Sequence, residues 1–167
     1  MTRVLFFLFF VFSFLPQATL ATPPTLTGMV LWVYDGDTIK VENIGKVRLI
    51  GIDAPEHKDS ERDNYYLRQG ISREHLRRTA KEALHFVIRN AKGKSVTIHH
   101  DKELKDRHGR TLAYVYLPDG ELLNRKLIDE GLATVYRKFN FHKKKDFLAA
   151  EKSARIKGVG LWGEVPN

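Results

Sequence analysis

The strongest constraint on the fold is a run of three short β-prone segments separated by tight turns. The segments cover residues 29–34, 38–42 and 46–50, with turn-forming residues at 35–37 and 43–45 between them. Strands joined by such short turns can only pair with their sequence neighbours in an antiparallel fashion. The sequence therefore predicts a β-meander at the start of the folded domain.

The remainder of the chain adds two strands and three helices to this meander. Apolar residues at 76, 80, 83, 84, 87 and 88 recur with the helical period, and Ser72 is a suitable N-cap. We expect further strands at residues 95–99 and 111–116, further helices at 122–130 and 144–157, and a mobile, charged surface loop at 57–70. The pattern predicts an α+β fold, mainly β, with a five-stranded barrel of the OB type and three helices.

The first 21 residues have the pattern of a secretory signal peptide. Arg3 precedes an apolar run over residues 4–15, and small residues follow, with Ala18 or Ala21 as the cleavage position. The apolar run is shorter than the ~20 residues of a membrane-spanning helix. An uncleaved N-terminal anchor is the alternative interpretation. We expect a secreted or periplasmic protein with no stable membrane insertion after the leader is cleaved.

Composition narrows the classes of function for the folded domain, residues 22–167. The chain of 167 residues contains no cysteine, which excludes thiol catalysis, iron–sulfur clusters and cysteine-based zinc sites. The formal net charge of +8 favours an anionic partner such as nucleic acid, although basic surfaces also serve solubility. We find a single domain and expect a monomer.

Two acidic clusters follow strand ends in the predicted meander. Asp35 and Asp37 lie in the first turn, and Asp53 and Glu56 follow the third strand. Because the third strand runs back toward that first turn, the clusters should meet at one end of the barrel. Carboxylates gathered in this way repel one another unless a cation neutralises them. With oxygen ligands and no cysteine, a hard cation such as Ca²⁺ is favoured.

Two arginines are candidates to accompany these acids. Arg48 lies within the third strand and faces away from its immediate neighbours, either outward as a solubilising charge or into the acidic pocket. Arg110 ends a polar turn that leads directly into an apolar strand. Arginine presents a planar fork of donors that matches phosphate oxygens.

Several segments together resemble the staphylococcal nuclease (thermonuclease) family. They are the turn at residues 35–38, the strand and acidic segment at 47–56, the turn and strand at 106–114, and the shorter matches at 131–133 and 160–162. The resemblance extends from about residue 28 to residue 162. It implies an OB-type barrel and Ca²⁺-dependent hydrolysis of DNA and RNA phosphodiesters with low sequence specificity.

The resemblance also implies roles for individual residues. Ca²⁺ would be bound by Asp37, Asp53 and the backbone carbonyl of Ala54, with Asp35 close to the metal but not bound to it. Glu56 would be the general base, and Arg48 and Arg110 would hold the scissile phosphate. Substrate contacts would come from Arg107, His108, Tyr136 and Phe139, where this chain departs from the family pattern.

Two functions from other classes compete with a nuclease. One is a non-catalytic OB-fold module that binds nucleic acid, and the other is a Ca²⁺-stabilised interaction domain of the cell envelope. The grouping of acids with two arginines favours the nuclease, because binding alone does not require the acids.

Overall fold

The computed structural model describes residues 25–163 of the chain. The predicted signal peptide at residues 1–21 lies outside the described residues and stays a prediction. Within residues 25–163, no helix combines the length and apolar character needed to cross a bilayer.

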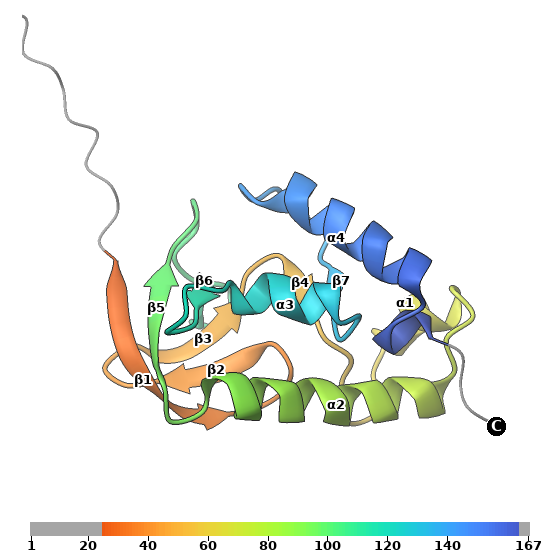
Figure 1. Cartoon of the computed structure of the whole chain (residues 1–167), viewed down its shortest axis with the longest axis horizontal. Coiled ribbons are helices and arrows are strands. Elements are labelled where there is room, and N and C mark those ends of the chain that lie inside the picture. Colours follow the sequence, from red (N-terminus) through yellow and green to blue (C-terminus); the bar gives the residue numbers. More distant parts are fainter. Residues whose placement is uncertain (1–24, 164–167) are drawn as a thin grey trace, which may run out of the picture.

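A closed five-stranded barrel forms the centre of the fold (Figure 1), which confirms the predicted barrel. Its strands are β1 (Leu26–Val33), β2 (Thr38–Val41), β3 (Gly45–Leu49), β5 (Ser95–His99) and β6 (Thr111–Tyr116). The order around the barrel is β1-β2-β3-β6-β5, and pairing of β1 with β5 closes it. Only the β3–β6 pair among these is parallel. The first three strands are the meander that the turn spacing predicts.

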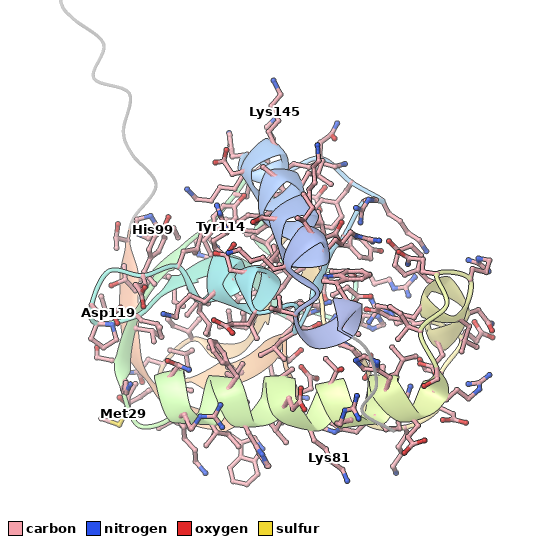
Figure 2. All side chains as sticks on the ribbon, turned by 45° about the vertical axis from the view of Figure 1, so that its right-hand side comes forward. Met29, Lys81, His99, Tyr114, Asp119 and Lys145 are labelled. Atoms are coloured by element: carbon pink, nitrogen blue, oxygen red, sulfur yellow. The ribbon has the colours of Figure 1, made fainter. Side chains whose placement is uncertain are left out.

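Three long helices pack around the barrel, as expected from the helical periodicity. They are α2 (Arg73–Ala91), α3 (Leu123–Asp129) and α4 (Lys144–Lys157). The predicted N-cap of α2 is confirmed, since the Ser72 hydroxyl accepts a hydrogen bond from the backbone N–H of His75 at 3.2 Å. Lys81 on α2 and Lys145 on α4 point outward from the molecule (Figure 2), so these basic residues belong to the surface.

Three small elements were not expected from the sequence. A short helix, α1 (Asp63–Leu67), forms in the segment predicted to be a mobile surface loop. A separate two-stranded sheet pairs β4 (Ile52–Asp53) with β7 (Thr134–Val135), and a 3₁₀ turn, η1 (Gly160–Trp162), ends the described chain. The two-stranded sheet matters for function because it fixes Asp53 opposite Thr134.

The prediction of a mobile, exposed loop at 57–70 is wrong for part of that segment because two of its residues are buried. Asp63 is 1% exposed and forms ion pairs with Arg73 and Arg77 at the start of α2. Tyr66 is also 1% exposed and packs with Leu76 and Leu161 in a small second core. A buried carboxylate paired with two arginines and a buried aromatic ring anchor α1 to the rest of the fold.

Gly36 allows α2 to approach the acidic turn between β1 and β2. A Cβ atom at this position would lie 2.7 Å from the Cβ of Ala83 on α2 and 2.8 Å from the Cβ of Ala54. Both distances are shorter than van der Waals contact, so only glycine permits this packing. The close approach brings the turn that carries Asp35 and Asp37 against the chain after β4.

Candidate active site

A buried arginine joins the two acidic clusters. Arg48 is only 7% exposed, and its Nη1 lies 2.8 Å from Oδ2 of Asp37 while its Nη2 lies 3.1 Å from Oδ1 of Asp53. The register of β2 and β3 places Arg48 opposite Thr38, next to the acidic turn. Of the two orientations left open by the sequence, Arg48 therefore adopts the one that faces the acids.

Hydrogen bonds hold the carboxylate of Asp37 in one orientation. Oδ1 accepts a hydrogen bond from the hydroxyl of Thr38 at 3.1 Å, and Oδ2 accepts one from the backbone N–H of Ala54 at 2.8 Å. The backbone N–H of Asp37 donates in turn to Oδ1 of Asp35 at 2.9 Å. The first acidic turn is thus tied directly to the segment that carries Asp53 and Ala54.

Two hydroxyl groups hold the backbone carbonyl of Asp53 in place. The hydroxyl of Tyr66 donates a hydrogen bond to the carbonyl oxygen of Asp53 at 3.1 Å, and the hydroxyl of Thr134 lies 3.3 Å from the same oxygen. Tyr66 belongs to α1 and Thr134 to β7, so two elements that the sequence did not predict position a predicted site residue.

A second arginine, Arg62, reaches the acids from the segment just before α1. Its Nη2 lies 2.7 Å from Oδ1 of Asp53 and its Nη1 lies 3.2 Å from Oε1 of Glu56. No local pattern in the sequence indicates this role of Arg62, because its place depends on the fold of α1. Glu56 itself is 41% exposed at its side chain and is accessible to water.

Two of the acids have raised pKa values despite these arginines. Burial, reinforced by the nearby charge of Asp37, raises the pKa of Asp35 from 3.8 to about 7. Burial also raises the pKa of Asp53 to about 6, although the charge of Arg48 opposes the rise. Carboxylates whose ionised form is disfavoured in this way gain from a further cation.

The oxygen atoms available here fit a hard divalent cation. Asp37 and Asp53 provide two carboxylates, and Ala54, the residue after Asp53, donates its backbone N–H to Asp37. Across residues 25–163, no group of three His, Cys, Asp or Glu side chains is arranged to hold a metal ion. Carboxylate oxygens are ligands that Ca²⁺ accepts.

Arg110 forms a different ion pair from Arg48. It directly precedes β6, which pairs in parallel with β3, the strand of Arg48. Its Nε donates to Oδ2 of Asp106 at 2.7 Å, and Oδ1 of Asp106 accepts the backbone N–H of Arg110 at 3.0 Å. Asp106 therefore orients a half-exposed guanidinium at this position.

The four predicted substrate contacts fall into two separate groups. Arg107 and His108 are exposed in the turn before β6, where Nε of Arg107 lies 3.0 Å from Nε2 of His108. Tyr136 and Phe139 follow β7, with ring centroids 5.2 Å apart. Of the four, only Tyr136 lines a groove together with Asp53.

The structure is an OB-type barrel in which a buried arginine joins two carboxylates. Comparison with known families identifies it further. The model of the family described as "Staphylococcal nuclease homologue" matches residues 46–164. The chain belongs to the staphylococcal nuclease family, and it is a nuclease, that is, a phosphodiester hydrolase.

Individual relatives agree over most of the chain. A thermonuclease of Staphylococcus hyicus is 34% identical over 150 residues, which cover 87% of this chain and 81% of the relative. A thermonuclease of Staphylococcus intermedius is 34% identical over 80% of this chain and 74% of its own length. A protein of Methanocaldococcus jannaschii described as uncharacterized is 40% identical over 81% of this chain and 70% of its own length.

The raised pKa values predict how stability depends on pH when divalent cations are removed by a chelator. A carboxyl group with a folded-state pKa above its unfolded value stabilises the fold at low pH, and this contribution is lost as the pH rises through the folded-state pKa. For Asp35 that loss falls between its ordinary pKa of 3.8 and about 7. We expect the free energy of unfolding in urea to fall by about 2 kcal/mol between roughly pH 5 and pH 8.

The matched variant is Asp35→Asn, which keeps the Oδ1 acceptor for the N–H of Asp37 and removes the titrating group. Its free energy of unfolding should change less over the same pH range. Equal slopes for the variant and the wild type would contradict the assignment of the raised pKa to Asp35.

Proposed function

We propose that this protein is an exported, Ca²⁺-dependent nuclease that hydrolyses both DNA and RNA with low sequence specificity. The observation that supports it most strongly is the buried Arg48 held between Asp37 and Asp53. A binding module has no need to bury two carboxylates that would repel a polyanion. A hydrolase needs them to hold the cation and the water of the reaction.

Asp37, Asp53 and the backbone carbonyl of Ala54 are the residues that would hold Ca²⁺ in this proposal. When bound, Ca²⁺ supplies positive charge that offsets the charge developing on the phosphate. Asp35 lies one hydrogen bond away, through the N–H of Asp37, and adds negative charge without binding the metal. The raised pKa values of Asp35 and Asp53 support a cation at this position.

The side chains around the cation site carry out the remaining steps. Arg48 and Arg110 bind the nonbridging oxygens of the scissile phosphate. For this, Arg48 must give up or share its ion pairs with Asp37 and Asp53. Arg110 can keep its Nε contact with Asp106 and use its Nη atoms.

Glu56 accepts a proton from the attacking water as the new P–O bond forms and the bond to the leaving oxygen breaks, and the leaving oxygen takes a proton from solvent water. Arg62 contacts Glu56 at 3.2 Å and must leave that contact, or share it, for the carboxylate to orient water.

The proposed substrate range and the proposed location of the protein rest on the phosphodiester group, the net charge and the signal-peptide pattern. The phosphodiester group is common to DNA and RNA, and none of the proposed catalytic groups reads a base. The net charge of +8 attracts any polyanion. Export rests on the signal-peptide pattern of residues 1–21, and we expect the mature protein to act as a monomer in the periplasm or outside the cell.

Cleavage assays with and without Ca²⁺ test this function. The mature protein, without residues 1–21, is incubated with plasmid DNA, denatured DNA and RNA, first with Ca²⁺ and then with excess EGTA. We expect all three to be cut only with Ca²⁺. Retention of the nucleic acid without cleavage would instead favour the binding module, and neither cleavage nor retention would favour the interaction domain.

Replacing Arg110 with alanine tests its contact with the phosphate. Arg110→Ala should lower kcat by about 100-fold or more, because one donor fork for the transition-state charge is lost. Arg125→Ala is the matched control, since Arg125 also pairs with an aspartate four residues away, at 2.9 Å from Asp129 on α3. Wild-type turnover in Arg110→Ala, or an equal loss in Arg125→Ala, would contradict the role.

A further inference from the structure

The outer surface of β1 carries large apolar side chains where a barrel strand that faces water normally carries polar ones. Met29, Leu31, Trp32 and Tyr34 are each between 38% and 54% exposed. By contrast, the exposed residues of β2, β3 and β5 are all lysine, serine or histidine. Met29 lies at the periphery of the molecule (Figure 2). Apolar side chains gathered in this way on one surface mark a site of interaction.

A β-bulge turns two successive apolar side chains of β1 outward. Val30 lies opposite Val41 and Trp32 lies opposite Lys40, so Leu31 is the extra residue in β1. Val30 still faces the core and is 1% exposed, whereas Leu31 and Trp32 are 44% and 54% exposed. The barrel core uses neither of these two side chains, so packing within the domain does not account for them.

Lysines surround the exposed apolar side chains. The strand register aligns Trp32 with Lys40 on β2, and Lys40 with Lys46 on β3, in a row across the outer face of the barrel. Nζ of Lys92 lies 4.8 Å from the centroid of the Trp32 ring. Nζ of Lys46 lies 4.5 Å from the centroid of the Tyr34 ring. Among residues 25–163 a single lysine is ion-paired, and it lies on α3, so the charges of these three are available to an anionic surface.

We propose that this surface binds the headgroup region of an anionic phospholipid bilayer. We call it the β1 face, and it consists of Met29, Leu31, Trp32, Tyr34, Lys40, Lys46 and Lys92. The apolar side chains enter between the headgroups, where tryptophan and tyrosine are favoured. The lysines extend along the apolar surface and bring their ammonium groups to the phosphate oxygens. This peripheral binding goes beyond the proposed nuclease activity and does not depend on it.

The composition of the β1 face favours lipid over nucleic acid or a second copy of the chain. Base stacking needs open aromatic ring faces, and a lysine ammonium covers one side of each ring here. The aliphatic side chains of Met29 and Leu31 contribute nothing to base stacking, but they gain from leaving water for lipid. A second copy docked face to face would bring the lysines of one copy against those of the other.

Co-sedimentation with lipid vesicles tests the β1 face. The mature protein is mixed, in EGTA, with vesicles of phosphatidylcholine alone and with vesicles of equal parts phosphatidylcholine and phosphatidylglycerol. We expect it to sediment with the anionic vesicles and to be released from them by salt. Trp32→Ala should weaken this binding about tenfold, because binding strength scales with the buried apolar area. Lys40→Gln should weaken it about fivefold, because one cation is lost at the membrane surface.

Matched control variants change the same kinds of side chain elsewhere. Ile156→Ala removes an apolar side chain that is 77% exposed on α4, and Lys81→Gln removes a lysine that points outward from α2 (Figure 2). Both should bind anionic vesicles as the wild type does. All four variants should cleave free DNA at the wild-type rate, because none of the four residues belongs to the proposed catalytic or metal-binding set.

Tryptophan fluorescence gives a second readout. The chain has two tryptophans, so Trp162→Phe leaves Trp32 as the only one. Its emission should shift to shorter wavelength with anionic vesicles, because the indole ring leaves water for the headgroup region. If Trp32→Ala fails to fold, as judged by thermal unfolding, Lys40→Gln and this shift decide the matter.

The outcomes separate the β1 face from the proposed function. Absence of binding to anionic vesicles, wild-type affinity in both Trp32→Ala and Lys40→Gln, or equal losses in the two controls would each overturn it. Weaker DNA binding or a lost dimer in Trp32→Ala, without vesicle binding, would assign the surface to nucleic acid or to a second copy and would also overturn it. A protein that binds vesicles through this face but cuts nothing would support the β1 face and refute the nuclease mechanism.

Discussion

The ion pairs of Arg48 with Asp37 and Asp53 are the interaction on which the site depends. Burying a guanidinium and two carboxylates is costly unless their geometry is fixed and their remaining polar atoms are satisfied. The fold meets both conditions, through the register that pairs Arg48 with Thr38 and through the backbone N–H of Ala54 that binds Asp37. Gly36 supports the same arrangement by allowing α2 to pack against the acidic turn.

The segment before α2, which contains α1, extends from the buried Arg48–Asp37–Asp53 ion pairs to the surface. Buried Asp63 and Tyr66 anchor α1, and the hydroxyl of Tyr66 reaches the carbonyl of Asp53 beneath the acids. The same segment brings Arg62 to Asp53 and Glu56, and it presents Tyr65 to the groove. This segment thus holds the backbone of Asp53 and adds a cation beside its carboxylate.

Local patterns predicted the barrel, but they did not predict the elements that exist through long-range contacts. Turn spacing and hydrophobic periods predicted the five barrel strands and the three long helices, because those signals lie within each segment. The β4–β7 pair joins residues 81 positions apart, Asp53 and Thr134, and only the folded chain brings them together. The charged composition of residues 57–70 did not predict α1, because long-range contacts stabilise it. Asp63 is buried through ion pairs with two arginines of α2.

Local patterns likewise predicted only some of the residues of the candidate site. The strand ends predicted the meeting of Asp37 with Asp53 and left two orientations open for Arg48, whereas Arg62 could not be predicted without α1. Arg107 and His108 lie in an exposed turn outside the groove that Tyr136 lines, and their contact with substrate stays a prediction.

Calorimetric titration of Ca²⁺ into the mature protein, in two buffers of different ionisation enthalpy at about pH 6.5, measures the central claim most directly. A site whose buried carboxylates lack positive charge should bind Ca²⁺ with a net release of protons, since the pKa values of Asp35 and Asp53 are raised to about 7 and about 6. Asp37→Asn should abolish the binding heat. Binding without proton release, or unchanged binding in Asp37→Asn, would contradict the account.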